Sequence, residues 1–126
     1  MQYSAYFGSQ EIKDKYVKRM KEHIEADELI RGVGFEHGKG CAVGCTLDRY
    51  SHNCFEYELG SPEWVALLID TFHVNTSYDV WPTFSINFLK AVKPGVNLNL
   101  IKPDLMKFIL WRNLNRVLDL DISDDL

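Results

Sequence analysis

Two cysteines four residues apart lie inside a glycine-rich stretch that no ordinary helix or strand would require. The stretch, Gly-Lys-Gly-Cys-Ala-Val-Gly-Cys-Thr over residues 38–46, contains Lys39, Gly40, Cys41 and Cys45. Two of the histidines lie close to it in the sequence, at positions 37 and 52. Thiols and imidazoles bind metals and serve as nucleophiles and bases, so this stretch is the first candidate for a functional site.

A metal centre is one possible use of these side chains. It would draw on Cys41, Cys45, His52 and Cys54, all of which carry ligand-type groups. Their spacing, Cys-x3-Cys-x6-His-x-Cys, matches no standard zinc finger or zinc ribbon. We therefore predict no cofactor, with zinc as the minor alternative.

A reactive thiol is a second possible use. If a helix begins near Gly40, its free N-terminal amides and the charge of Lys39 would favour the thiolate of Cys41. A histidine, His23 or His52, would then act as the base. The stretch is not a nucleotide-binding P-loop, because its Gly-Lys is not followed by serine or threonine.

Two carboxylates are candidates to orient such a histidine. His23 and Asp27 are four residues apart on the predicted first helix, which makes them neighbours on one side of it. A carboxylate in that position fixes the tautomer of the imidazole. Glu58 is the second candidate. The simpler interpretation of the His23–Asp27 pair is that it only stabilises the helix.

The simplest interpretation of Cys41 and Cys45 is also structural. Free cysteine is usually a small buried residue, and at this spacing both side chains would share one face of a helix. Gly44 would allow a neighbouring helix to approach closely. The motif would then be a packing contact rather than a chemical site.

The first helix is the clearest predicted element. Ile12, Tyr16, Met20 and Ile24 recur every four residues, and with Ser9 as N-cap and a glycine stop at position 32 they predict a helix over 10–31. The basic residues of this segment (Lys13, Lys15, Lys18, Arg19 and Lys21) are interpreted as its solvated side rather than as a nucleic-acid face. Residues 1–8 are aromatic and are predicted to pack on the surface as a tail.

Further helices are predicted from start signals and apolar spacing. One runs from about 40 to 50, and another begins at Ser61-Pro62-Glu63 and ends near 72–74. A third opens at Trp81-Pro82 and ends before a Lys-Pro-Gly turn at 93–95. The last begins at Pro103-Asp104, with an apolar stripe of Met106, Ile109, Leu110, Leu114 and Val117. Strand patterns are confined to two very short segments, so we predict an all-α bundle of four to five helices.

Composition limits the class of protein. At 126 residues the chain is expected to form a single domain over 1–126, with a flexible acidic tail at about 119–126. The formal net charge of −4 opposes nucleic-acid binding. There is no apolar run long enough for a bilayer and no signal-like start, so we expect no membrane association and a cytoplasmic location.

At the glycine–cysteine motif the chain resembles an uncharacterised family of bacterial hypothetical proteins. The matching pieces lie between residues 6 and about 100 and include Gly38 to Leu47, Tyr57 to Gly60 and Trp81-Pro82. The resemblance implies no activity, but His23, Asp27, Lys39, His52 and Glu58 all fall inside the matching pieces, whereas Cys54 does not.

From the sequence we therefore predict a small cytoplasmic helical binding or interaction module with its site near Gly38–Thr46. Its partner would be a protein or a small ligand. The alternative is an enzyme or metalloprotein that uses Cys41 with His23 or His52, and Asp27 or Glu58.

Overall fold

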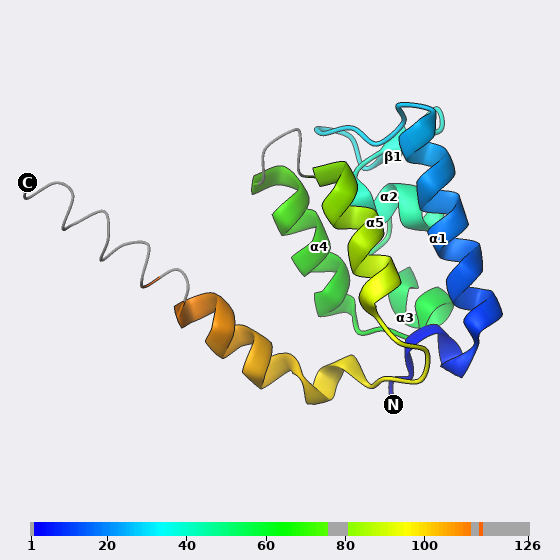
Figure 1. Cartoon of the computed structure of the whole chain (residues 1–126). Helices are drawn as coiled ribbons and strands as arrows, with labels where there is room; N and C mark the ends of the chain where they lie inside the picture. The colour runs from blue at the N-terminus through cyan, green and yellow to red at the C-terminus, as the bar shows by residue number, and fades with distance from the viewer. Residues whose placement is uncertain (1, 76–80, 112–113, 115–126) are drawn as a thin grey trace, which may run out of the picture.

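Helices make up most of the protein. A computed structural model of the chain describes residues 2–75, 81–111 and 114 (Figure 1). In chain order the elements are the 3-10 helix η1 (Ala5–Gly8), α1 (Gln10–Glu25), β1 (Phe35–Glu36), β2 (Lys39–Gly40), α2 (Ala42–Leu47), α3 (Cys54–Leu59), α4 (Glu63–Asn75), α5 (Trp81–Ala91) and the 3-10 helix η2 (Leu98–Leu100). Residues 102–111 are also helical. The predicted helical fold class is confirmed, with one small two-stranded sheet added to it.

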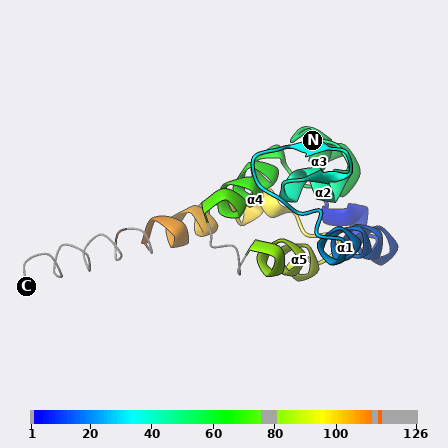
Figure 2. The same cartoon turned by 90° about the horizontal axis from the view of Figure 1, so that it is seen from above.

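Helix α2 lies at the centre of the fold. It contacts α1 on one side and α4 on the other, and α5 contacts the same two helices. Seen from above, α2 and α5 lie on opposite sides of the α1–α4 pair (Figure 2). All six residues of α2 are buried, so this short, small-residue helix forms the middle of the core.

Helix α1 is capped as predicted but ends earlier than predicted. The Ser9 hydroxyl accepts a hydrogen bond from the Ile12 amide at 3.1 Å, which is an N-cap. The predicted end near residue 31 is wrong, because α1 stops at Glu25 and Asp27 takes a left-handed φ of 59°. Beyond it, Leu29 pairs with Gly40 as an isolated bridge. Residues 28–30, which the prediction placed in the helix, instead form an extended segment beside the motif.

The start of the motif is a tight hairpin. Strands β1 and β2 are antiparallel, with Phe35 opposite Gly40 and Glu36 opposite Lys39. The two turn residues, His37 and Gly38, both have positive φ (54° and 78°), as a type I′ turn requires. A β-hairpin therefore leads into α2.

Glycines 40 and 44 bring α2 against the loop that precedes β1, not against another helix. A Cβ atom on Gly40 would lie 2.1 Å from the Gly34 carbonyl oxygen, and one on Gly44 would lie 1.9 Å from the same atom. The prediction that Gly44 admits a neighbouring helix is therefore wrong. Helix α2 is also shorter than predicted, because Asp48 turns left-handed with a φ of 57°.

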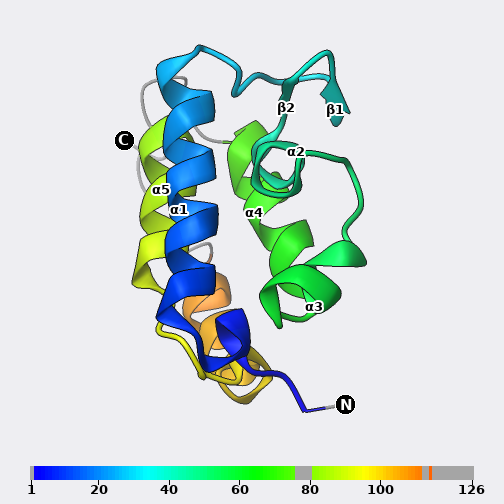
Figure 3. The same ribbon diagram turned by 90° about the vertical axis from the view of Figure 1, so that its right-hand side faces the viewer.

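The N-terminal segment is part of the core. Ala5 and Tyr6 are buried, and the Tyr6 hydroxyl donates to the Leu89 carbonyl at 2.7 Å. The Ala5 amide donates to the Val96 carbonyl at 2.8 Å. The prediction of a surface tail is wrong, because this segment ties the start of the chain to the end of α5 (Figure 3).

The helical residues 102–111 project away from the bundle (Figures 1 and 2). A last helix near Pro103 is confirmed, but its predicted apolar stripe does not reach the core, because Leu110 and Leu114 are 68% and 59% exposed. Val117 and the acidic tail at 119–126 lie outside the described residues. Across the described residues, no helix combines the length and apolar character needed to cross a membrane.

Candidate functional site

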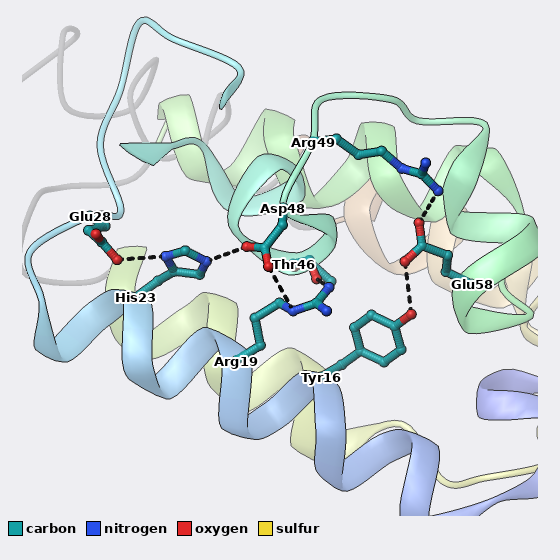
Figure 4. Close-up of polar contacts among 8 residues, drawn as sticks. All are labelled: Tyr16, Arg19, His23, Glu28, Thr46, Asp48, Arg49 and Glu58. Atoms are coloured by element: carbon teal, nitrogen blue, oxygen red, sulfur yellow. Dashed lines mark hydrogen bonds and ion pairs between the residues drawn. The ribbon is translucent and has the colours of Figure 1, made fainter. Parts of the chain in front are cut away.

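The predicted site residues separate onto two sides of α2. His23 and Glu58 lie on the side of α1, within a row of polar contacts that we call the α1 seam (Figure 4): Tyr16, Arg19, His23, Glu28, Thr46, Asp48, Arg49 and Glu58. Cys41 and His52 lie on the side of α4. The predicted combination of Cys41 with His23 as its base is therefore not made.

His23 lies between two carboxylates. Its Nδ1 is 2.9 Å from Glu28 Oε1, and its Nε2 is 2.6 Å from Asp48 Oδ1. Both nitrogens can donate at once only when the ring is protonated. The predicted partner Asp27 is exposed and makes neither contact, because α1 ends before it and the chain turns Glu28 back toward the helix. Each ring nitrogen of His23 therefore has a carboxylate partner in the seam.

Arg19 joins α1 to the end of α2. Its Nη1 donates to the Thr46 carbonyl at 3.0 Å, and its Nε lies 3.2 Å from Asp48 Oδ2. A cation at this place pairs with carbonyls that a helix C-terminus leaves without partners. Asp48 is thus fixed by its left-handed backbone, by Arg19 and by His23.

Glu58 completes the seam on α3. The Tyr16 hydroxyl donates to Glu58 Oε1 at 2.9 Å, and Arg49 forms an ion pair with Glu58 Oε2. Burial, followed by the bond to Glu58, raises the pKa of Tyr16 to about 12. Tyr16, Arg19 and His23 are three and four residues apart, so α1 presents them on one face. Every carboxylate of the seam has a partner within it.

The α4 side contains a pocket that includes a cysteine of the motif. This cavity, which we call the motif pocket, has a volume of about 250 Å³. It is lined by Gly32, Val33, Gly34, Cys41, Tyr50 and Asp70. A Cβ on Gly34 would lie 2.4 Å from the Tyr50 ring, so the absence of a side chain lets the ring lie against the loop. The pocket therefore depends on the glycines before the motif as well as on the motif.

Asp70, on α4, organises the pocket. Its Oδ1 accepts the Val43 amide at 3.2 Å, which satisfies a free N–H at the start of α2. Its Oδ2 lies 2.7 Å from His52 Nε2. The His52 ring in turn packs edge-on against Tyr50, with centroids 5.0 Å apart. The predicted site residue His52 is thus held beside the pocket by a carboxylate that the sequence had not indicated.

Cys41 has a thiol that favours its protonated form. Burial, supported by the nearby Asp70 and opposed by the first amides of α2, raises the pKa of Cys41 to about 12. The expectation of a stabilised thiolate is therefore wrong, because loss of solvation outweighs the helix amides. Lys39, expected to add positive charge, is exposed on β2 and does not line the pocket.

Cys45 is a core residue. It is fully buried, and its thiol lies 3.4 Å from the Gly40 carbonyl oxygen and 3.5 Å from that of Glu28. Burial raises the pKa of Cys45 to about 12 as well. Within the described residues, no group of three His, Cys, Asp or Glu side chains lies close enough together to hold a metal ion.

Several residues of these two sites were missed in the sequence. Asp70 carries the one available signal, since it is the only charged residue in the apolar run 64–72 of α4. Tyr50, Glu28 and Asp48 carry no comparable signal, because their roles depend on turns and on partners distant in sequence.

Comparison of the chain with protein-family models, with curated proteins and with solved structures gives no match.

Proposed function

We propose that the chain is a small cytoplasmic binding module whose ligand occupies the motif pocket. The pocket brings Cys41 of the glycine–cysteine motif together with an aromatic ring, that of Tyr50, and a carboxylate, that of Asp70. Small-ligand sites are typically concave and mostly apolar, with a few polar groups that orient the ligand. The motif pocket has this composition, although its volume suits only a small ligand or one group of a larger one.

The charge of the lining is the observation that carries the proposal. Asp70 is the acidic group of the pocket, and no lysine or arginine among the described residues lines it. The thiol of Cys41 and the phenol of Tyr50 stay neutral at pH 7, since burial raises both pKa values. A carboxylate beside an aromatic ring favours a ligand with a cationic nitrogen, such as an alkylammonium or guanidinium group.

Backbone NMR with small probes tests this proposal. We expect methylammonium and methylguanidinium, titrated into the millimolar range, to shift the amide signals of Gly34, Tyr50 and Asp70. Acetate at equal concentration is expected to leave these signals unchanged. Equal shifts with acetate, or cation-induced shifts confined to the α1 seam, contradict the proposal.

Two variants sharpen the assay. Tyr50→Ala removes the aromatic wall at an exposed position and should weaken the cation-induced shifts. Tyr57→Ala, at an exposed tyrosine on α3 outside the pocket, is the matched control and should leave them intact. The enzyme alternative predicts that iodoacetamide alkylates Cys41 rapidly and stoichiometrically at pH 7, because this reaction requires a thiolate.

A further inference from the structure

An apolar groove lies at the base of the projecting helix. We call it the α4–α5 groove; its volume is about 350 Å³, and its walls include Trp64 on α4, Phe88 on α5 and Val92 directly after α5. Ile101 and Leu105 close it on the side where the projecting helix begins. Polar contacts lie around the Trp64 ring: its indole N–H donates to Asn99 Oδ1 at 2.6 Å, and the Lys102 ammonium lies 5.5 Å from the ring centroid.

The helix over 102–111 continues from this groove into solvent. Phe108, Leu110, Trp111 and Leu114 are 54%, 68%, 63% and 59% exposed. These positions cover a wide part of the helix circumference, and an apolar helix surface of this width is normally buried against another element. The helix points away from the described bundle (Figures 1 and 2), and each of these four side chains keeps more than half of its surface exposed.

We propose that a second copy of this chain covers the helix, by a reciprocal exchange in which the helix of each copy lies in the α4–α5 groove of the other. The groove and the helix are adjacent on one chain, so a two-fold axis between two antiparallel helices makes both contacts at once. The interface is isologous and closed.

The exposed apolar area is sufficient for such a dimer. Leu100, Ile101 and the four exposed residues of the helix together present roughly 600 Å² per copy, taking about 150–250 Å² for a fully exposed large side chain. Two copies would then bury on the order of 1,200 Å², the lower limit of stable specific interfaces.

Charge favours a second copy over a lipid surface. Helices that lie on membranes carry a polar face rich in lysine and arginine. The described helix has Lys102 and Lys107 together with Asp104, and the whole chain has a formal charge of −4. A reciprocal apolar contact has no need of an anionic surface.

Sedimentation equilibrium of the full chain from about 1 to 500 μM tests the inference. The wild-type chain should form dimers within this range. Leu110→Glu combined with Leu114→Glu (the helix variant) and Ala91→Glu (the groove variant) should each weaken association by about tenfold or more, since each places charge in an apolar contact. All three positions are exposed, so the fold should persist, which far-UV circular dichroism checks. Tyr57→Glu, at a 72% exposed position on α3, is the control and should dimerise like wild type.

A mixture of the two variants distinguishes exchange from other dimers. The helix variant keeps an intact groove and the groove variant keeps an intact helix, so an equimolar mixture should form heterodimers with one intact contact. Each variant alone should remain monomeric at the same concentration. A monomeric wild-type chain, dimers unaffected by the helix variant, or no recovery in the mixture would overturn the inference. Binding of a monomeric wild-type chain to anionic vesicles through this helix would also overturn the inference.

Discussion

Replacing Gly44 with alanine sets two structural effects of opposite sign against each other. Gly44 is in the middle of α2, where alanine is intrinsically the better helix former by about 1 kcal/mol. If local helix propensity decided the result, Gly44→Ala would stabilise the protein. Tertiary packing predicts the reverse, because the new Cβ would lie 1.9 Å from the Gly34 carbonyl oxygen.

The size of the opposing effect follows from what Gly34 does. Its carbonyl accepts the Cys41 amide at 3.1 Å and lies 3.6 Å from the Cys41 sulfur. To admit a Cβ, the loop and α2 must separate from 1.9 Å to at least 3.0 Å, and the atom that must move is backbone. Overpacking of this kind costs about 1–3 kcal/mol, and a weakened hydrogen bond adds about 0.5–1.5 kcal/mol. After the helix-propensity gain is subtracted, we expect Gly44→Ala to destabilise by about 1–3 kcal/mol.

Urea denaturation followed by circular dichroism measures this difference. Gly38→Ala is the comparison: Gly38 has a φ of 78°, but a Cβ there would make only an ordinary contact, 3.5 Å from Glu28 Oε2, so backbone strain of about 1–2 kcal/mol is the main cost expected. In Gly44→Ala the amide signals of Gly34 and Cys41 should also move, whereas Gly38→Ala should leave the Cys41 signal in place. A Gly44→Ala protein as stable as wild type, or more stable, would refute the packing argument.

Three further predictions follow from buried groups and ion pairs. His73 is buried on α4 and donates from Nε2 to the Ile30 carbonyl at 2.8 Å, and burial lowers its pKa. Below pH ~6.5 the unfolded chain then binds more protons than the folded chain, so the contribution of neutral His73 to the free energy of unfolding is full above this pH and falls below it. The urea midpoint of His73→Gln should therefore vary less with pH than that of the wild-type chain over this window. Since burial raises the pKa of Cys41 and Cys45 to about 12, one thiol, that of half-buried Cys54, should react quickly with Ellman's reagent at pH 8, and Cys54→Ser should remove this fast phase. Arg19→Met should lower the free energy of unfolding by about 1–2 kcal/mol, because its contacts to Asp48 and Thr46 are lost. Lys18→Met loses only an exposed ion pair with Glu22 and should be nearly neutral. Equal losses in the two variants would contradict the role of Arg19.

Local signals predicted the helices well but not the site. Ser9, the Pro62-Glu63 start and the turn before Gly95 act through neighbouring residues, so the sequence alone indicates where α1, α4 and the end of α5 lie. The same reasoning extended α1 past Glu25, because Leu29 and Ile30 fit a helical stripe as well as they fit an extended segment beside Gly40. Whether these two residues become helical or extended depends on Gly40 of the motif, with which Leu29 pairs. The spacing of apolar residues carries no information about this partner.

The composition of the glycine–cysteine motif sets it apart from the rest of the chain, and its helix α2 lies in the middle of the core. What composition could not indicate is which atoms meet. The alternative interpretation of the sequence paired Cys41 with a histidine, but its environment is set by Gly34 and by Asp70, a residue 29 positions later on another helix. The His23 contacts were misassigned for a similar reason, since Asp48 reaches His23 only because α2 ends in a left-handed turn.

The sequence by itself determined the helical class, the Ser9 cap of α1 and the places where α4 and α5 begin, because these depend on residues within about one helical turn. Only the tertiary structure decided that Gly44 faces a carbonyl, that burial raises the pKa of the Cys41 thiol and that the last helix leaves the bundle. Each of these depends on desolvation or close contact between segments far apart in the chain, and such effects arise only when the chain has folded.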